Sequence, residues 1–235
     1  MERLDKYLSL ALGISRSDAK KMLKKQNVTL NSIRATDSDA KVNLECDTVK
    51  IDGKPVSYKK NIYIMVNKPK GVISASDDKK AKTVVDLVPE PLRRNGLFPA
   101  GRLDADTTGF VLVTDDGDFA HRILSPKNHV EKTYIAILEK TLDSDDIQRF
   151  SEGIELKDGT VCLEGKVRMI CDCPPTAEVI IHEGKYHQVK RMFAALGNRV
   201  IELKRVKIGK LHLDESLKEG ECREITENEL NKITS

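Results

Sequence analysis

The segment from residue 101 to residue 114 constrains the fold of this chain most. Its first part, Gly101-Arg102-Leu103-Asp104-Ala105-Asp106-Thr107-Thr108-Gly109, is rich in turn-forming residues and contains two aspartates. The apolar run Phe110-Val111-Leu112-Val113 follows at once and is short enough to be a buried strand. Because rigid elements commonly support reactive side chains in adjoining loops, Asp104 is the first candidate for a reactive residue.

Composition and length are those of a globular protein with a sizeable core, and the strand and helix patterns described below predict an α+β fold. The chain has 235 residues, a mass of 26.3 kDa, 39% hydrophobic residues and a mean hydropathy of -0.41. No apolar run approaches the roughly 20 residues of a membrane span, and the first residues lack the apolar stretch of a secretory signal. The five cysteines form no C-x-x-C pair and are expected to be reduced thiols. We therefore expect a cytoplasmic protein with no membrane partner.

Charge divides the chain into two parts. Residues 1–60 hold 13 Lys and Arg against 8 Asp and Glu, whereas the remaining residues hold 27 against 29. The polar stretch Ser57-Tyr58-Lys59-Lys60-Asn61 separates two patterned regions, so we predict domains at 1–60 and 61–235. A basic module most often binds nucleic acid, although the same charges also suit an ordinary solvated helix face.

The basic part has the pattern of two helices and a short sheet. Leu4, Leu8 and Ala11 have helical spacing and precede Gly13, and Ser15 is placed to cap a second helix whose lysines lie opposite its apolar stripe. The sequence here resembles the S4 RNA-binding domain through Arg3-Leu4-Asp5-Lys6-Tyr7-Leu8, Ser15-Arg16-Ser17-Asp18-Ala19 and Val28-Thr29-Leu30-Asn31. The candidate RNA contacts of this part are Arg3, Arg16, Lys20, Lys21 and Lys24.

The second part alternates strand and helix patterns. We expect strands at 62–66, 72–74, 132–138 and 177–181, and helices at 83–88 and 189–196. Alternation in the 132–138 strand places Tyr134 on one face with Ala136 and Leu138. Helical periodicity places Lys190 beside the buried stripe that contains Val189, which makes Lys190 a candidate for a pocket.

The motifs that are missing narrow the possible chemistry. The sequence has no phosphate-binding loop, G-x-G-x-x-G, G-x-S-x-G or H-E-x-x-H. The candidate reactive groups that remain are an aspartate in a loop, a tyrosine on a strand and a cation on a helix flank. A cation can keep such an aspartate ionised and oriented for attack at a sugar or base carbon. Taken singly, Asp104 also suits a turn, Tyr134 a half-buried strand and Lys190 a solvated helix flank.

Taken together, these segments resemble the RNA pseudouridine synthases, in the branch acting on ribosomal RNA that includes the small-subunit synthase A type. The matching segments are Asn67-Lys68-Pro69-Lys70-Gly71, Gly101-Arg102-Leu103-Asp104 with Thr107-Thr108-Gly109, Glu131-Lys132-Thr133-Tyr134 and 184–193. The resemblance implies a catalytic domain built on a mixed, largely antiparallel sheet with flanking helices. It also implies isomerisation of one uridine of 16S ribosomal RNA, at the uridine-516 type site, without a cofactor.

The resemblance assigns roles to individual side chains. Asp104 matches the family's essential aspartate, Tyr134 the aromatic residue that packs against the base, and Lys190 the basic residue that pairs with the aspartate. Many relatives have arginine at the last position, and a lysine supplies one point charge in place of a bidentate fork. Arg102 is a candidate to fill the space that a flipped uridine leaves, or to bind a phosphate. The substrate would be ribosomal RNA in an assembling small subunit, and the enzyme a monomer.

Several alternatives stay open. The substrate is 23S ribosomal RNA in one of them, and in another the chain is a non-catalytic S4-containing assembly factor. We expect no metal, although Asp104, Asp106, Asp115 and Asp116, or the set Cys171, Cys173, His182 and His187, are conceivable ligands. Asp106 is expected to hold its own turn through backbone hydrogen bonds. With aromatic residues at 4%, RNA recognition is expected to rest on shape and charge, without an open stacking platform.

Overall fold

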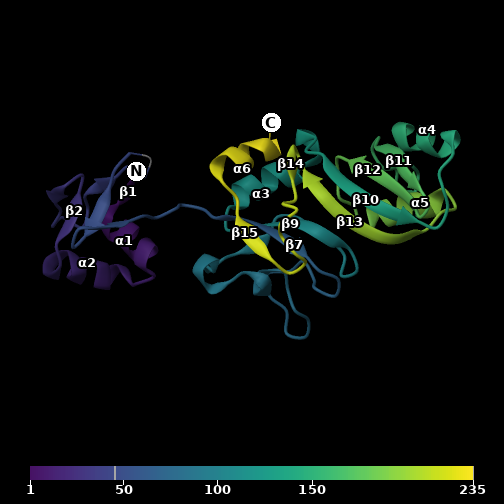
Figure 1. The fold of residues 1–235 in the computed structure, drawn as a ribbon. Helices are drawn as coiled ribbons and strands as arrows, with labels where there is room; N and C mark the ends of the chain where they lie inside the picture. The colour runs from purple at the N-terminus through teal and green to yellow at the C-terminus, as the bar shows by residue number, and fades with distance from the viewer. Residues whose placement is uncertain (45, 235) are drawn as a thin grey trace. The chain divides into compact units, whose positions relative to one another are not determined.

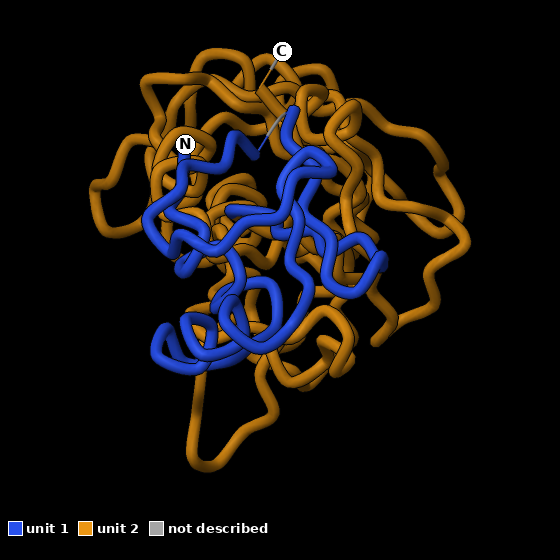
Figure 2. Tube along the Cα trace, turned by 90° about the vertical axis from the view of Figure 1, so that its left-hand side faces the viewer, with its two compact units in different colours: residues 1–60 blue, residues 61–235 orange. Residues whose placement is uncertain are grey.

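The structure is a computed structural model that describes residues 1–44 and 46–234. The chain is an α+β protein and divides into two compact units, residues 1–60 and residues 61–235 (Figure 2). Each unit has a hydrophobic core of its own. Over the part of the chain that the structure describes, none of the helices is both long enough and apolar enough to cross a membrane.

The first unit consists of two helices and short strands around one core. The helices are α1 (Leu4–Leu12) and α2 (Arg16–Lys25). A four-stranded sheet has the order β3-β2-β5-β6, and a separate pair joins β1 to β4. These strands are β1 (Glu2–Arg3), β2 (Val28–Leu30), β3 (Ile33–Arg34), β4 (Lys41–Val42), β5 (Val49–Ile51) and β6 (Lys54–Val56).

The helix ends of this unit lie where the sequence predicts them. Gly13 ends α1 in the left-handed conformation at φ 67°, which a residue without a Cβ adopts at low cost. The Ser15 side chain accepts a hydrogen bond from the Asp18 backbone N–H at 3.1 Å and so caps α2. Leu8 and Leu23 then face the core.

The second unit is built on a mixed sheet of nine strands. The central order is β11-β12-β10-β13-β9-β7-β15 (Figure 1). In addition, β14 pairs with β13, and β8 pairs with β9. Only the β13–β9 pair is parallel among the strand pairs of the described residues. The strands are β7 (Tyr63–Lys68), β8 (Phe98–Pro99), β9 (Thr108–Thr114), β10 (Lys132–Leu138), β11 (Lys166–Asp172), β12 (Pro175–Ile181), β13 (Val200–Ile208), β14 (Leu211–His212) and β15 (Cys222–Glu224). The predicted mixed, largely antiparallel sheet with flanking helices is confirmed.

Helices cover the sheet. They are α3 (Gly117–Leu124), α4 (Ser144–Glu152), α5 (Gln188–Ala195) and α6 (Glu227–Thr234), together with the 3-10 turns η1 (Val85–Leu87), η2 (Glu90–Leu92) and η3 (Pro126–Asn128). Two separate cores result. The core with α4 and α5 contains Val111 and Val113, whereas the core with α3 and α6 contains Phe110 and Leu112.

β9 is therefore the strand between the two cores. All seven of its residues are buried, and successive side chains enter opposite cores. This confirms the buried strand predicted behind the aspartate loop. Burying one large apolar side chain contributes about 1.5–3 kcal/mol, so the strand is a firm support for the loop before it.

Two expected elements differ from the structure. Residues 72–74 form no strand, and only an isolated bridge joins Ile73 to Thr83. Residues 83–88 contain a single 3-10 turn in place of a longer helix. This segment has other partners: the Val72 carbonyl accepts a hydrogen bond from Lys68 Nζ, and the Ser74 hydroxyl is hydrogen-bonded to the Leu103 backbone.

Candidate active site

The loop that carries Asp104 is anchored on both sides of that residue. The Ser74 hydroxyl donates to the Leu103 carbonyl and accepts from the Leu103 N–H, both at 3.0 Å. On the other side, the Ala105 carbonyl accepts a hydrogen bond from the Gly71 N–H at 2.7 Å. Because both neighbours are fixed, the backbone of Asp104 has little freedom to move.

Lys68, at the end of β7, supports the same loop from inside the protein. Its side chain is fully buried, and Nζ donates to three carbonyls, those of Val72 at 2.6 Å, Pro69 at 3.0 Å and Ala105 at 3.2 Å. Burial lowers the pKa of Lys68 to about 8, although nearby carboxylates oppose the shift. The Asn67-Lys68-Pro69-Lys70-Gly71 motif thus supplies a cation that ties β7 to the loop.

Gly109 brings the loop close to β13. It pairs with Arg205 in the parallel register and has φ 100°, a conformation that favours glycine. A Cβ at this position would lie 2.2 Å from the Arg205 carbonyl oxygen. No larger residue fits without displacing one of the two strands.

The Asp104 carboxylate has two side-chain partners from the start of α5. Lys190 Nζ lies 3.2 Å from Oδ2, and His187 Nε2 lies 3.4 Å from Oδ1. Lys190 Nζ also contacts Asp106 Oδ1 at 2.6 Å, so one ammonium group serves both aspartates.

These contacts shift two pKa values. Burial alone would lower the pKa of Lys190, but hydrogen bonds from Lys190 to Asp106 and Asp104 outweigh it and raise the pKa. The same hydrogen bond to Lys190 lowers the pKa of Asp106. Lys190 is therefore a cation at neutral pH and Asp106 a carboxylate.

The segment before α5 is held in place by buried polar contacts. Gln188 is buried, and its amide Nε2 donates to Glu183 Oε1 at 2.8 Å. Its Oε1 accepts from the Lys185 N–H at 2.9 Å. His187 then takes the left-handed conformation, with φ 48° and ψ 34°, and this turn starts the helix. Lys190 follows one turn later on the side of His187.

Tyr134 on β10 lines the same space as Asp104. A cavity of about 690 Å³ is bordered by Asp104, Arg102 and Tyr134, together with Lys132 and Arg205. The Arg205 guanidinium lies 6.0 Å from the centre of the Tyr134 ring, and its Nε donates to the Phe110 carbonyl at 2.7 Å. Its Nη2 is buried without a hydrogen-bond partner among the described residues.

The structure brings together the three residues that the sequence singles out. Asp104, Tyr134 and Lys190 line one smaller cavity of about 60 Å³, which also borders the 184–190 segment. Arg102 lines both cavities and is exposed. The cavity of about 690 Å³ is the larger of these two spaces, and Asp104 borders both.

The other candidate RNA contacts lie in the first unit, and three of them surround one acid. Arg16 Nη2 lies 2.8 Å, Arg3 Nη2 3.1 Å and Lys20 Nζ 3.7 Å from the Asp5 carboxylate, whose side chain is fully buried. Hydrogen bonds from Arg3 and Arg16 hold the pKa of Asp5 well below its usual range. These cations have structural partners, because Arg3 also pairs with Asp39. Three cations therefore face two carboxylates.

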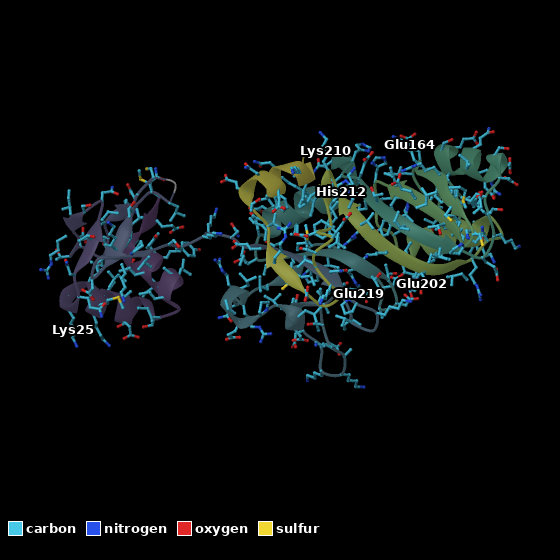
Figure 3. All side chains as sticks on the ribbon, in the orientation of Figure 1. Lys25, Glu164, Glu202, Lys210, His212 and Glu219 are labelled. Atoms are coloured by element: carbon cyan, nitrogen blue, oxygen red, sulfur yellow. The ribbon has the colours of Figure 1, made fainter. Side chains whose placement is uncertain are left out.

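The remaining lysines of α2 point to solvent. Lys21 pairs with Asp18 at 3.2 Å, and Lys24 is exposed. Lys25 ends the helix at the edge of this unit (Figure 3). The exposed side of α2 is thus cationic, as the sequence predicts.

Sequence reasoning missed two partners at the site. Asp106 is expected to hold its own turn, and besides a backbone hydrogen bond there its carboxylate also contacts Lys190. His187 was considered only as a metal ligand, whereas its ring lies beside Asp104. The spacing of His187 and Lys190, three residues apart at the start of a helix, was the available signal, because such residues share a face.

The aspartates considered as metal ligands have other partners. Asp115 accepts a hydrogen bond from the Ile62 N–H at 2.8 Å, and Asp116 caps α3 by accepting from the Phe119 N–H at 3.0 Å. Within residues 1–44 and 46–234, no three side chains of His, Cys, Asp or Glu gather to hold a metal ion.

Comparison with known proteins gives a separate match for each of the two units. The family model for RNA pseudouridylate synthase matches residues 62–195, and the S4 domain model matches residues 2–49. A crystal structure of a pseudouridylate synthase superposes with a TM-score of 0.69 at 39% identity, covering 99% of this chain and 100% of that one.

Two relatives match over nearly their whole length. An uncharacterised RNA pseudouridine synthase of Bacillus subtilis is 42% identical, covering 98% of both chains. The ribosomal small subunit pseudouridine synthase A of Vibrio cholerae is also 42% identical, covering 98% of this chain and 99% of the relative. The chain therefore belongs to the RNA pseudouridylate synthase family and is an RNA pseudouridine synthase with an S4 domain.

Proposed function

We propose that this enzyme isomerises one uridine of 16S ribosomal RNA, with Asp104 as the reactive group. The observation that carries the proposal is the Asp104 carboxylate at the edge of the 690 Å³ cavity, between Lys190 and His187. Its side chain is 26% exposed, so a substrate can reach it. The name of the Vibrio cholerae relative supports small-subunit RNA as the substrate.

The reaction breaks the bond between N1 of uracil and C1′ of ribose and forms a bond from C5 to C1′. The C5 proton is lost and N1 gains one, so the reaction neither adds atoms nor changes the overall oxidation state. An ionised carboxylate can attack either the sugar or the base, and both routes fit this site. Side chains alone can perform such an isomerisation, and we propose that it proceeds without a cofactor.

The neighbours of Asp104 have distinct roles in this proposal. Lys190 orients the carboxylate through their ion pair, and Tyr134 packs against the uracil that enters the cavity. Arg102 occupies the place that the flipped nucleotide vacates or binds its phosphate. A lysine holds Asp104 by one point charge, so its orientation depends on further contacts such as that with Asp106.

The first unit would hold the RNA. The cations Arg3, Arg16, Lys20, Lys21 and Lys24 lie on α2 or next to it, and neutralising phosphates supplies sequence-independent affinity. We propose that the monomer acts on an assembling small subunit, at the uridine-516 type site.

Replacing Asp104 by asparagine tests the proposal. The change keeps the size of the side chain but removes the nucleophilic charge, so we expect pseudouridine formation on a 16S transcript to fall at least about 1,000-fold. RNA affinity should change little. Single-turnover assays and a filter-binding titration on the same transcript measure both quantities.

The same assay distinguishes the alternatives. If the enzyme modified a 23S transcript and left the 16S transcript unmodified, its substrate would be large-subunit ribosomal RNA. If the wild-type enzyme bound both transcripts but modified neither, it would behave as a non-catalytic assembly factor. If the D104N variant kept full activity, Asp104 would not be the reactive group.

A further inference from the structure

Tyr186 is an exposed aromatic residue at the rim of the candidate site. It is 76% exposed, whereas the other four tyrosines and all five phenylalanines are buried or half-buried. An exposed aromatic ring does not contribute the free energy that its burial would give. An exposed ring beside a cavity can gain that free energy when a partner binds to it. Tyr186 borders the 690 Å³ cavity that contains Asp104 and Tyr134.

The ring of Tyr186 is stacked on that of His187. The ring centres are 3.8 Å apart and the planes differ by 19°. Adjacent side chains point to opposite sides in a strand and diverge by about 100° in a helix, so they stack only at a special turn. The left-handed conformation of His187, which residues other than glycine rarely adopt, provides that turn.

The pair is anchored to the reaction site. His187 Nε2 lies 3.4 Å from Asp104 Oδ1, which fixes the inner ring relative to the carboxylate. The backbone of Tyr186 is held by a hydrogen bond from Arg191 Nη1 to its carbonyl at 3.3 Å, and its ring is held by the stacking on His187. Binding to this preorganised surface would therefore cost little conformational entropy.

We propose that the Tyr186–His187 pair is a stacking site for a nucleobase of the substrate RNA that neighbours the target uridine. This inference rests on the proposed function. A flat aromatic face binds any base by stacking, without hydrogen-bond readout.

The base that stacks on Tyr186 is a neighbour of the target uridine and not the target itself, because of where the exposed face of the Tyr186 ring lies. Asp104 meets the edge of the inner ring, while the exposed face belongs to the outer ring, one ring plane further away. A base on that face is too far from the carboxylate to be the one that reacts. The expectation that recognition rests on shape and charge alone is thus incomplete, because this one aromatic pair adds a stacking contact.

The absence of tryptophan from the chain permits a direct test. Tyr186→Trp introduces a single indole at the proposed site, and Ile170→Trp introduces one at an exposed position of β11 as a matched control. Stacking quenches indole emission. We expect saturating 16S transcript to quench the emission of Y186W at least about twofold and to leave that of I170W nearly unchanged.

Affinity supplies the second measurement. Tyr186→Phe keeps the ring and should bind the transcript like the wild type, whereas Tyr186→Leu should bind about tenfold more weakly. An unquenched Y186W at saturation, or equal affinities of Y186L and the wild type, would overturn the stacking site. Pseudouridine formation by the wild type on the same transcript reports separately on the proposed function.

Discussion

At the scale of single residues, the unusual feature of the site is one ammonium group shared by two carboxylates. Lys190 Nζ is closer to Asp106, at 2.6 Å, than to Asp104, at 3.2 Å. A lysine ends in a point charge on a flexible stem, so its position depends on the number of anchors, whereas an arginine fork orients itself on a carboxylate. We therefore expect Asp106 to act as a positioning residue that holds Lys190 beside Asp104.

We predict that Asp106→Asn slows pseudouridine formation about tenfold, because a neutral amide holds the ammonium group less firmly than a carboxylate. RNA affinity should not change. In a Lys190→Arg background the same substitution should slow pseudouridine formation clearly less, since a guanidinium can bind Asp104 through two hydrogen bonds. Single-turnover rates of the four proteins measure the coupling. Equal losses in both backgrounds would contradict the positioning role.

At the scale of elements, the site depends on how closely the start of β9 approaches β13. We predict that Gly109→Ala lowers the free energy of unfolding by about 3 kcal/mol or more, because its Cβ would lie 2.2 Å from the Arg205 carbonyl oxygen. Gly117→Ala is the matched control. This glycine is the first residue of α3, and its Cβ would meet nothing within 4 Å.

The control substitution should change stability by less than about 1 kcal/mol, because alanine is a better helix former than glycine. Chemical denaturation followed by circular dichroism compares the two variants. If G109A were as stable as G117A, β9 and β13 would not be in the close parallel contact described above.

The same elements show what can be predicted from the sequence. The buried strand β9 and the helix α5 were predicted because a local pattern of apolar residues determines each of them. The parallel β9–β13 pairing was not predicted, because it joins residues about 95 positions apart, and nothing local specifies it. The support of the loop by the Lys68 amine was missed for the same reason, since its carbonyl partner Ala105 lies 37 residues away.

At the scale of the whole molecule, the chain combines a basic unit with a nearly neutral one that holds the candidate site. The second unit has two hydrophobic cores within residues 61–235, so it has the means to fold by itself. We predict that deleting residues 1–60 weakens RNA binding and makes its dependence on salt shallower, because fewer phosphates are neutralised.

A full-length variant refines this prediction. Neutralising Lys20, Lys21 and Lys24 to glutamine should reduce the slope of log K against log salt by up to about 0.7 for each phosphate that the protein no longer neutralises. Titrations at several salt concentrations give the slope. The same slope for the wild type, the deletion and the triple variant would show that the first unit does not carry the electrostatic part of RNA binding.

Mapping pseudouridine in cells shows whether Asp104 serves to isomerise one uridine of small-subunit ribosomal RNA. Ribosomal RNA is compared between cells that lack this gene and the same cells supplied with the wild type or with Asp104→Asn. We predict that one pseudouridine of 16S RNA disappears without the gene, returns with the wild type and stays absent with D104N. An unchanged 16S map in all three strains, or a site restored by D104N, would contradict the claim.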